Sequence, residues 1–398
     1  MTQLQDHMRF LCDTTRMLAG LTVAYGTAQD CEWETYGRAC EQPARPLAPD
    51  SLYDLASLTK LFTCVAALQL VQEGKLSLSE CAGRIDPRFE NLRDVSVEDI
   101  LSFRVCLKTP GRIDDTPARE EGLRRLFGVT VCPPPAIRLY SDINAMVIKY
   151  LIEAKTGMAF YDVLKTAVFR PAGMTETFSA VPSACRSRCV CYNNEHQIIN
   201  GQYILRTDIP LGTPNDPKAS LLSDGGRDLC GHAGLFSTRK DMVRFSQALL
   251  SEKLLSRDML RQIGINRTGF PYPDGTHRQY LGYLCFSKHP NQHLSEVPSW
   301  MGGRAFGLSG FTGNHLSIDP DAGCFVLFLG NRCHGRVSRI VPAEDGASLG
   351  LDARGVGLIR WPNGQLVPSS SQYVHFKDEY LHAPIEKRMR ELGWIPKH

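Results

Sequence analysis

The most constraining feature of the chain is the segment Leu52 to Gly74, LYDLASLTKLFTCVAALQLVQEG, which is apolar nearly all round. Its apolar residues recur with the period of a helix, and Gly74 supplies a stop signal. A helix that is apolar on every side is buried among other elements, because no face of it suits water. The segment therefore predicts a buried helix, on which a charged residue needs a partner or a function.

Composition and charge narrow the class of protein. The chain has 398 residues, of which 43% are hydrophobic, so it can bury a large core. Its 45 basic residues barely exceed its 42 acidic residues, and a net charge of +3 provides neither a nucleic-acid-binding surface nor a polybasic membrane patch. The expected partner is a small-molecule substrate, with no nucleic acid and no membrane. The sequence does not indicate an oligomeric state.

The N-terminus and the cysteines bear on localisation. Residues 1–20 are interrupted every few positions by polar side chains, so they lack the apolar core of a secretory signal peptide. Fourteen cysteines without such a signal are typical of free thiols in a reducing compartment. The sequence therefore predicts a cytoplasmic protein without a disulfide framework.

Strand patterns stand at both ends of the chain. Gly20 to Thr27 and Cys31 to Gly37 are predicted to form a hairpin. From Gly307 the patterns GLSGFTGNHLSIDP and GCFVLFLGNR predict further strands, and an Asp-Pro-Asp-Ala-Gly turn joins them into a second hairpin. The clearest helices between the two ends are Asp142 to Thr156 and Lys240 to Leu250.

This order of elements predicts an α/β (α+β) fold, in which helices flank an antiparallel sheet and a mainly helical domain is inserted. Residues 1–74 and 281–398 are expected to form one discontinuous α/β domain, with the buried helix at the edge of its sheet. Residues 75–280 are expected to form the inserted domain. The tail from Ser338 carries a helical pattern through Glu386 to Leu392 and is otherwise not diagnostic.

The buried helix carries the pattern Ser57-Leu58-Thr59-Lys60. Residues three apart share a helix face, so the Ser57 hydroxyl and the Lys60 ammonium can meet. A serine hydroxyl is a poor nucleophile until a base takes its proton, and a lysine can be that base if its surroundings lower its pKa toward neutrality. The structural alternative is a helix-start serine and a lysine that reaches toward water.

The same spacing occurs a second time, from Ser237 to Lys240, where the context favours a structural role. Ser237 or Thr238 stands at the expected start of a helix, and Asp241 is placed to complete a capping arrangement with Thr238. We therefore interpret the second match as a helix cap.

Two further elements allow both a structural and a chemical interpretation. Tyr140, Ser141 and Asp142 stand at the entry of a predicted helix, where Ser141 or Asp142 can cap it while the Tyr140 hydroxyl takes part in proton transfer. The strand segment Leu308 to Phe311 contains Gly310, which permits the close approach of a ligand. A strand N–H after this glycine can help to hold an oxyanion.

Together these three elements resemble the serine hydrolases of the β-lactamase and penicillin-binding-protein family. That family combines Ser-x-x-Lys, a Tyr- or Ser-x-Asn element and a Lys/His-Thr/Ser-Gly strand in this order. The resemblance looks closest to the class C-like and esterase-like branch and extends from Gly20 to Arg332. It implies a β-lactamase-like fold and acyl transfer to water, through an acyl-enzyme, on an ester, amide or lactam. No cofactor and no metal are predicted.

The resemblance also implies roles for individual residues. Ser57 would be the acylated nucleophile, Lys60 its base, and Tyr140 would share the proton transfer. The backbone N–H groups of Ser57 and Phe311 would form the oxyanion hole. The implied substrate-binding positions are Asp142, Leu308, Ser309, Gly310 and Phe311.

Two positions depart from the family pattern. Asp142 stands where the family usually has Asn, so a carboxylate that only accepts hydrogen bonds replaces an amide. This favours an amine-bearing substrate or a strong interaction with Lys60. Leu308 stands where the family usually has Lys or His, a group that commonly helps to bind a substrate carboxylate. The residues that could replace it are Arg304, Arg332 and His315.

Two other motifs compete with this interpretation. Gly346 to Gly350 matches the G-x-S-x-G pattern of α/β-hydrolases, but it lacks the preceding buried strand and the following helix that the motif needs. A set of thiols and an imidazole could offer zinc ligands, but its spacing does not match a familiar C-x-x-C pair. The members of that set are Cys185, Cys189, Cys191, Cys230 and His232.

The sequence therefore predicts a serine hydrolase that cleaves a small ester or amide through a Ser57 acyl-enzyme. A β-lactamase, or a D-amino-acid peptidase or amidase, is an alternative with the same residues. An acyltransferase, or a catalytically decayed β-lactamase-like binding protein, also stays open, because Leu308 and Asp142 depart from the family pattern.

Overall fold

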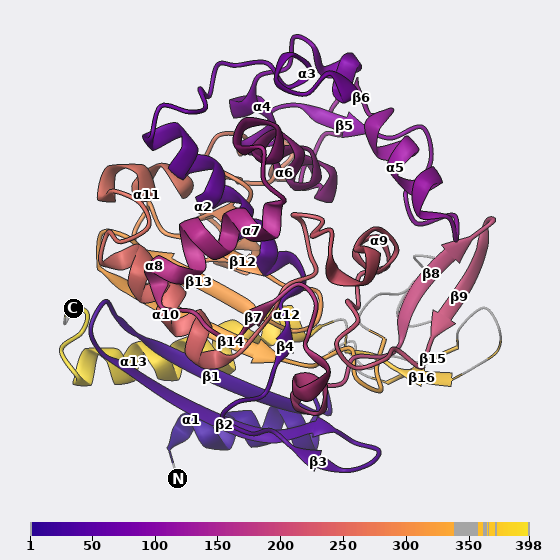
Figure 1. The fold of residues 1–398 in the computed structure, drawn as a ribbon. Coiled ribbons are helices and arrows are strands. Elements are labelled where there is room, and N and C mark those ends of the chain that lie inside the picture. Colours follow the sequence, from indigo (N-terminus) through magenta and orange to yellow (C-terminus); the bar gives the residue numbers. More distant parts are fainter. Residues whose placement is uncertain (1, 338–356, 361–363, 365, 371, 397–398) are drawn as a thin grey trace.

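The computed structural model describes residues 2–337, 357–360, 364, 366–370 and 372–396, and its largest sheet has seven strands in the order β11-β12-β13-β14-β1-β2-β3 (Figure 1). Every neighbouring pair in this sheet is antiparallel, as the sequence predicts. Strands from the two ends of the chain meet in its middle, where Leu21 pairs with Gly330 and Thr27 with Cys324. The strands of this sheet are β1 (Gly20–Thr27), β2 (Cys31–Cys40), β3 (Arg45–Pro46), β11 (Phe286–Ser287), β12 (Phe306–Ser309), β13 (His315–Asp319) and β14 (Cys324–Gly330).

Strand β14 shows why this sheet lies at the centre of the molecule. All its residues are buried, because alternate side chains enter two separate cores. Phe325 and Leu327 face the larger core, which the helices of the middle of the chain cover, whereas Val326 and Phe328 face a second core. Both predicted hairpins, β1 with β2 and β13 with β14, are confirmed.

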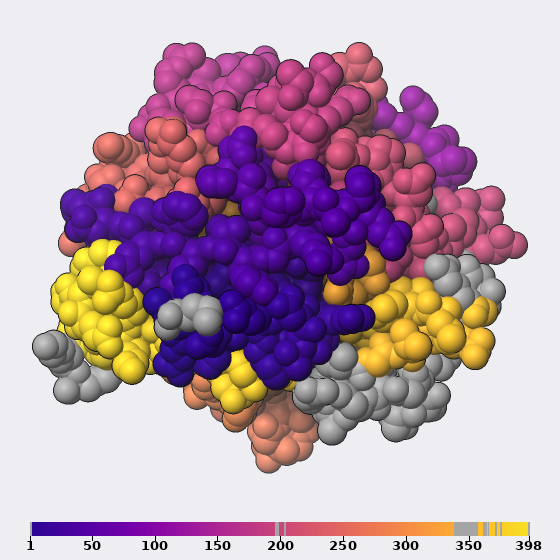
Figure 2. Space-filling view, turned by 90° about the horizontal axis from the view of Figure 1, so that it is seen from below, coloured from indigo at the N-terminus to yellow at the C-terminus, as the bar shows by residue number. Residues whose placement is uncertain are grey.

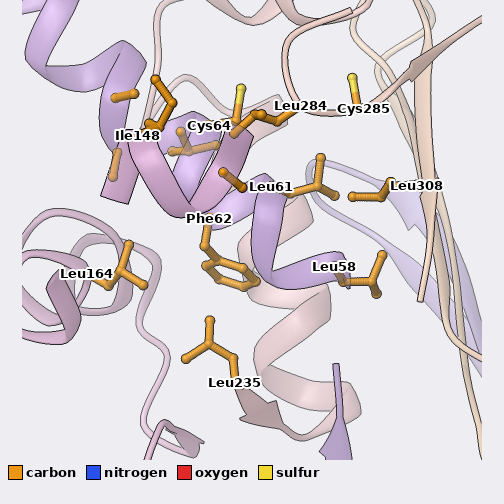
Figure 3. Packing of buried hydrophobic residues seen from close by; sticks show 14 of the residues in the cluster. Leu58, Leu61, Phe62, Cys64, Ile148, Leu164, Leu235, Leu284, Cys285 and Leu308 are labelled. Carbon is orange, nitrogen blue, oxygen red and sulfur yellow. The ribbon is translucent and has the colours of Figure 1, made fainter. Parts of the chain in front are cut away.

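The larger core is built around helix α2 (Thr59–Gln72), which is buried along most of its length and packs against α6 (Asp142–Thr156). Figure 3 shows Leu58 and Leu61 of this region beside Leu308 of the sheet. The helix starts later than the sequence pattern predicts. Tyr53 and Asp54 form the short strand β4, which pairs with β10 (Phe236–Ser237), and a 3-10 turn, η2 (Ala56–Leu58), then leads into α2.

The second core is covered by elements from both ends of the chain, α1 (Gln3–Arg9), α12 (Tyr373–Lys377) and α13 (Ala383–Glu391). Leu4 and Met8 of α1 pack with Ile385 and Met389 of α13 in this core. Figure 2 shows the N-terminal residues, in indigo, directly beside the yellow C-terminal residues.

The remaining elements connect these layers. Helix α10 lies within the range 75–280 expected for the inserted domain and packs on β1 and β14 of the large sheet. The other helices are α3 (Ala82–Ile85), α4 (Val97–Leu101), α5 (Arg119–Phe127), α7 (Phe160–Leu164), α8 (Arg170–Ala172), α9 (Pro217–Leu222), α10 (Arg239–Leu250) and α11 (Arg257–Ile263). The other strands are β5 (Cys106–Lys108), β6 (Thr130–Cys132), β7 (Thr177–Phe178), β8 (Glu195–Ile199), β9 (Gln202–Arg206), β15 (Leu358–Arg360) and β16 (Leu366–Pro368).

Two features of the sequence fall wholly or partly outside the described residues. The G-x-S-x-G match at Gly346 to Gly350 and much of the tail after Ser338 lie outside the described residues. None of the helices in the described ranges is both long enough and apolar enough for a membrane-spanning segment.

Candidate active site

The structure brings Ser57 and Lys60 together at the start of the buried helix. Lys60 Nζ donates a hydrogen bond to Ser57 Oγ at 2.8 Å and another to the His232 carbonyl oxygen at 3.2 Å. Lys60 is 0% exposed, whereas Ser57 is partly exposed and lines a cavity. The Lys60 side chain therefore hydrogen-bonds to Ser57 and does not extend into water.

The charge on Lys60 is held by Asp142, at the first position of α6. Asp142 Oδ1 lies 2.8 Å from Lys60 Nζ. Burial lowers the pKa of Lys60, but Asp142 and Tyr140 together outweigh burial, and the pKa is raised above its usual value. This is the reverse of the lowered pKa that an apolar helix suggests, and the main cause is the carboxylate that stands where the family usually has an amide.

A second lysine extends this ion pair into a chain of alternating charges. Lys218 Nζ lies 3.1 Å from Asp142 and 3.2 Å from Asp216, and His232 Nε2 lies 3.0 Å from Asp216. Burial opposes the charge of Asp142, but Lys60, Lys218 and His232 hold its pKa below the usual range. Since Lys60 and Lys218 both pair with Asp142, side chains of the protein already bind its carboxylate.

Sequence reasoning missed Asp216 and Lys218. The Asp-Pro pair at 216–217 is a signal for a helix start, and Asp216 does cap α9 by accepting from the Ala219 N–H. That signal carries no information about proximity to Lys60. Ligand atoms of Asp142, Asp216 and His232 lie within 4.8 Å of one another. They do not fit a metal site, because ammonium groups already occupy both carboxylates.

Tyr140 stands beside Lys60, held by stacking and by its backbone. Its ring stacks on Phe286 at 5.2 Å between centroids, and its N–H donates to Gln279 Oε1 at 2.9 Å. Lys60 Nζ lies 5.0 Å from the centre of the tyrosine ring. Burial raises the pKa of Tyr140 above its usual value, although Lys60 opposes this. Hydrogen-bonding interactions with Lys60 and Ser57 also oppose this rise, which places the buried hydroxyl close to both side chains.

The Ser57 N–H, which the family resemblance implies as one of two oxyanion donors, lies at a helix start beside the cavity. Ser57 lies in the first turn of a helix, where N–H groups have no acceptor within the helix. Phe311 lines the same cavity and follows Gly310. A Cβ at Gly310 would lie 2.8 Å from the Leu55 carbonyl oxygen, so this close approach of strand and helix needs glycine.

Two predicted substrate-binding side chains do not line the cavity. Leu308 is 0% exposed and packs in the core beside α2 (Figure 3). Ser309 points to the opposite side of the sheet, where its hydroxyl donates to Glu296 Oε2 at 2.6 Å and lies 3.2 Å from Lys377 Nζ. Any contact of these two residues with substrate would therefore involve their backbone.

The cavity has a volume of about 380 Å³ and combines both signs of charge. Of the candidates to replace a cation at position 308, Arg332 lines it, whereas Arg304 and His315 do not. The lining residues are Ala56, Ser57, Arg112, Asp114, Arg138, Tyr140, Asp142, Glu195, Asn215, Asp216, Pro217, Lys218, Ala233, Phe311 and Arg332.

The second Ser-x-x-Lys match takes a structural position. Thr238 caps α10 by accepting from the Asp241 N–H at 3.3 Å, so the second Ser-x-x-Lys match is a helix start as predicted. Among the described residues, Cys191 forms a group of possible metal ligands with Cys40 and His334. Within the part of the chain that the structure describes, it forms no such group with Cys185, Cys189 or Cys230, the cysteines that the sequence suggested as zinc ligands.

The comparisons with known proteins agree with this fold. A family model described as Beta-lactamase matches residues 13–349. The chain therefore belongs to the Beta-lactamase family. It is 26% identical over 323 residues to a protein of Salmonella enteritidis PT4 (strain P125109) named "Putative D-alanyl-D-alanine carboxypeptidase", across 73% of this chain and 71% of that protein.

Solved structures confirm the β-lactamase-like fold. The octameric penicillin-binding protein homologue from Pyrococcus abyssi matches with a TM-score of 0.61 and 16% identity, over 83% of this chain and 73% of that one. A structure described as a class C beta-lactamase matches with a TM-score of 0.59 and 17% identity, over 83% and 90% of the two chains. At such identities the likeness concerns the fold alone.

Proposed function

We propose that the protein is a serine hydrolase that cleaves a small ester or amide through an acyl-enzyme on Ser57. The observation that carries the proposal is the 2.8 Å hydrogen bond between Lys60 Nζ and Ser57 Oγ at the edge of a cavity. Membership of the Beta-lactamase family supports the same class of reaction.

The proposed acylation begins with proton transfer from Ser57. Lys60 must first lose its own proton, and its raised pKa makes the neutral form scarce at neutral pH. Neutral Lys60 then takes the Ser57 proton as Oγ attacks the carbonyl carbon. The N–H groups of Ser57 and Phe311 hold the developing oxyanion. Tyr140, protonated at neutral pH, passes its proton to the leaving group and regains one from Lys60. Water then attacks the acyl group, gives up a proton to Lys60, and Ser57 Oγ leaves with a proton from the same groups.

The substrate class stays open between two candidates. The name of the Salmonella relative supports a D-amino-acid peptidase or amidase. The buried Leu308 instead supports an ester or amide without the carboxylate that a cation at this position commonly binds. An acyltransferase uses the same residues and differs only in the acceptor. A decayed binding protein is less compatible with a fully buried lysine that contacts the serine.

A substrate panel tests the proposal. Acyl esters, D-amino-acid amides and β-lactams are incubated with the wild type, Ser57→Ala and Ser237→Ala. Turnover by the wild type and Ser237→Ala, and none by Ser57→Ala, is expected for at least one compound. Binding without turnover that survives in Ser57→Ala would support the decayed binding protein instead, and transfer to an added alcohol or amine would identify an acyltransferase.

A further inference from the structure

Asp54 is a buried carboxylate that the proposed proton transfers do not use. It is 1% exposed and lies in β4, three residues before Ser57. Its Oδ1 accepts a hydrogen bond from the Ala56 N–H at 2.9 Å, and its Oδ2 accepts one from the Asn215 N–H at 2.7 Å. One carboxylate thus joins two chain segments that both line the cavity.

The first of these segments is the turn that presents the nucleophile. Ala56 has a φ of +46°, in the left-handed region that a residue with a Cβ rarely adopts. A hydrogen bond from a backbone N–H to the Asp side chain two residues earlier is a contact that holds such turns. Because Ser57 follows Ala56 directly, this contact controls the direction of both the Ser57 hydroxyl and the Ser57 N–H.

The second segment carries charges that extend the Lys60–Asp142 ion pair. Asn215 is followed by Asp216 and, two residues later, by Lys218, which pairs with Asp142. The fixed Asn215 N–H therefore ties this wall of the cavity to the turn before Ser57. The main chain of Asp54 adds a third tie, since its carbonyl oxygen accepts hydrogen bonds from Thr312 and Asn314, just beyond Phe311.

Asp54 is charged in surroundings that oppose its charge. Burial raises the pKa of Asp54 to about 6, although the N–H groups of Asn215 and Ala56 lower it. Asp216 adds to the rise and Arg206 opposes it. The other titratable groups that face Asp54 are Tyr192 and Cys189, and burial raises the pKa of both, so they are neutral near pH 6.

We propose that Asp54 is a positioning residue, whose ionised carboxylate locks the left-handed turn before Ser57 to the Asn215 segment. The inference rests on the proposed function, because it concerns the presentation of Ser57 as a nucleophile. Protonation turns one carboxyl oxygen into a donor, which conflicts with an N–H that needs an acceptor. Acylation of Ser57 should therefore slow as Asp54 takes up a proton.

The test measures the rate constant for labelling of Ser57 by a fluorophosphonate probe at pH values on both sides of 6. Because Lys60 must also lose its proton, the wild-type rate is expected to fall about tenfold per pH unit above the pKa of Asp54 and about a hundredfold per pH unit below it. In Asp54→Asn, the rate at neutral pH should fall by at least roughly tenfold, and the steeper fall below the pKa of Asp54 should disappear, so that only the slope due to Lys60 is left. The double variant Asp54→Asn/Ala56→Gly should regain part of the rate, since glycine adopts a left-handed turn without support.

The matched control is Asp319→Asn. Asp319 is also 1% exposed and accepts from the N–H groups of Gly302, Asp321 and Ala322, but it does not line the cavity. Its replacement should leave the pH profile of labelling unchanged. A change in that profile similar to the one in Asp54→Asn would overturn the proposal.

The remaining outcomes separate this inference from the proposed function. A wild type that is not labelled at Ser57 at any pH contradicts the proposed function itself. A labelled wild type whose steeper fall below pH 6 persists in Asp54→Asn refutes the role of Asp54 alone. If neither variant folds, the wild-type profile decides, because a labelling rate whose slope with pH does not change near pH 6 overturns the inference.

Discussion

Replacement of Asp142 by Asn should move the pH dependence of Ser57 acylation toward acid. Burial lowers the pKa of Lys60, and the Asp142 carboxylate, 2.8 Å away, acts together with Tyr140 to raise it above its usual value. An opposite charge at this range shifts a pKa by roughly 1–3 units, or about 1.4–4 kcal/mol. Without the carboxylate, the neutral fraction of Lys60 at a fixed neutral pH should rise roughly 10- to 1,000-fold.

The assay is the rate constant of Ser57 labelling as a function of pH, for the wild type and Asp142→Asn. In the wild type the rate should rise toward alkaline pH, as Lys60 loses its proton, and in the variant this rise should occur roughly 1–3 pH units lower. Glu73→Gln is the control, because it removes an exposed carboxylate that pairs with Lys75. A profile that is unmoved, or moved to higher pH, would refute the reasoning.

The same substitution should lower stability within a defined range of pH. The pKa of Asp142 is lowered in the folded chain, so its contribution is present above about pH 4 and is lost as pH falls further. The pKa of Lys60 is raised, so its contribution is present below about pH 10 and is lost as pH rises further. Between these limits Asp142→Asn strands a buried lysine, which should lower the free energy of unfolding by about 3–5 kcal/mol. Denaturant unfolding at neutral pH measures this, and an unchanged value would contradict it.

Three further perturbations test other parts of the structure. Ala56→Gly should leave the free energy of unfolding unchanged or raise it by up to about 1 kcal/mol, because glycine removes the strain of the positive φ; a clear loss in a denaturant titration would contradict this. Leu308→Ala should lower it by about 2–5 kcal/mol, since Leu308 is fully buried, and a loss below 1 kcal/mol would place this side chain outside the core. A mild disulfide oxidant should join Cys106 and Cys132, whose Sγ atoms lie 3.0 Å apart across paired strands, and should stabilise the fold by roughly 3–4 kcal/mol. Mass spectrometry without a linked peptide would refute that pairing.

The sheet and the start of the catalytic helix show how far the sequence leads. The hairpins and helix α6 follow from alternation, turn residues and helical period, which are local properties of the chain. The sequence pattern places the start of the buried helix too early. The Asp54 side chain accepts a hydrogen bond from the Ala56 N–H, and helical structure begins only at η2. That bond belongs to a buried turn, and hydrophobic periodicity contains no sign of it.

The candidate site was predicted in part for a similar reason. Ser57 and Lys60 share one helix turn, so their spacing alone predicts that they meet. Asp216 and Lys218 join the Lys60–Asp142 ion pair only because the tertiary fold brings them to Asp142. Their local sequence pattern indicates no more than a helix cap. The effect of Asp142 on Lys60 also depends on a distance, which the identity of the two residues does not supply.

The proposed acyl-enzyme can be observed by intact-mass spectrometry after a brief incubation with an activated acyl ester. The wild type and Ser237→Ala should each gain the mass of one acyl group, and peptide mapping should locate that group on Ser57. Ser57→Ala should gain none. Acylation of Ser57→Ala to the same extent as the wild type, or an acyl group mapped to another residue, would contradict the proposal that Ser57 is the nucleophile.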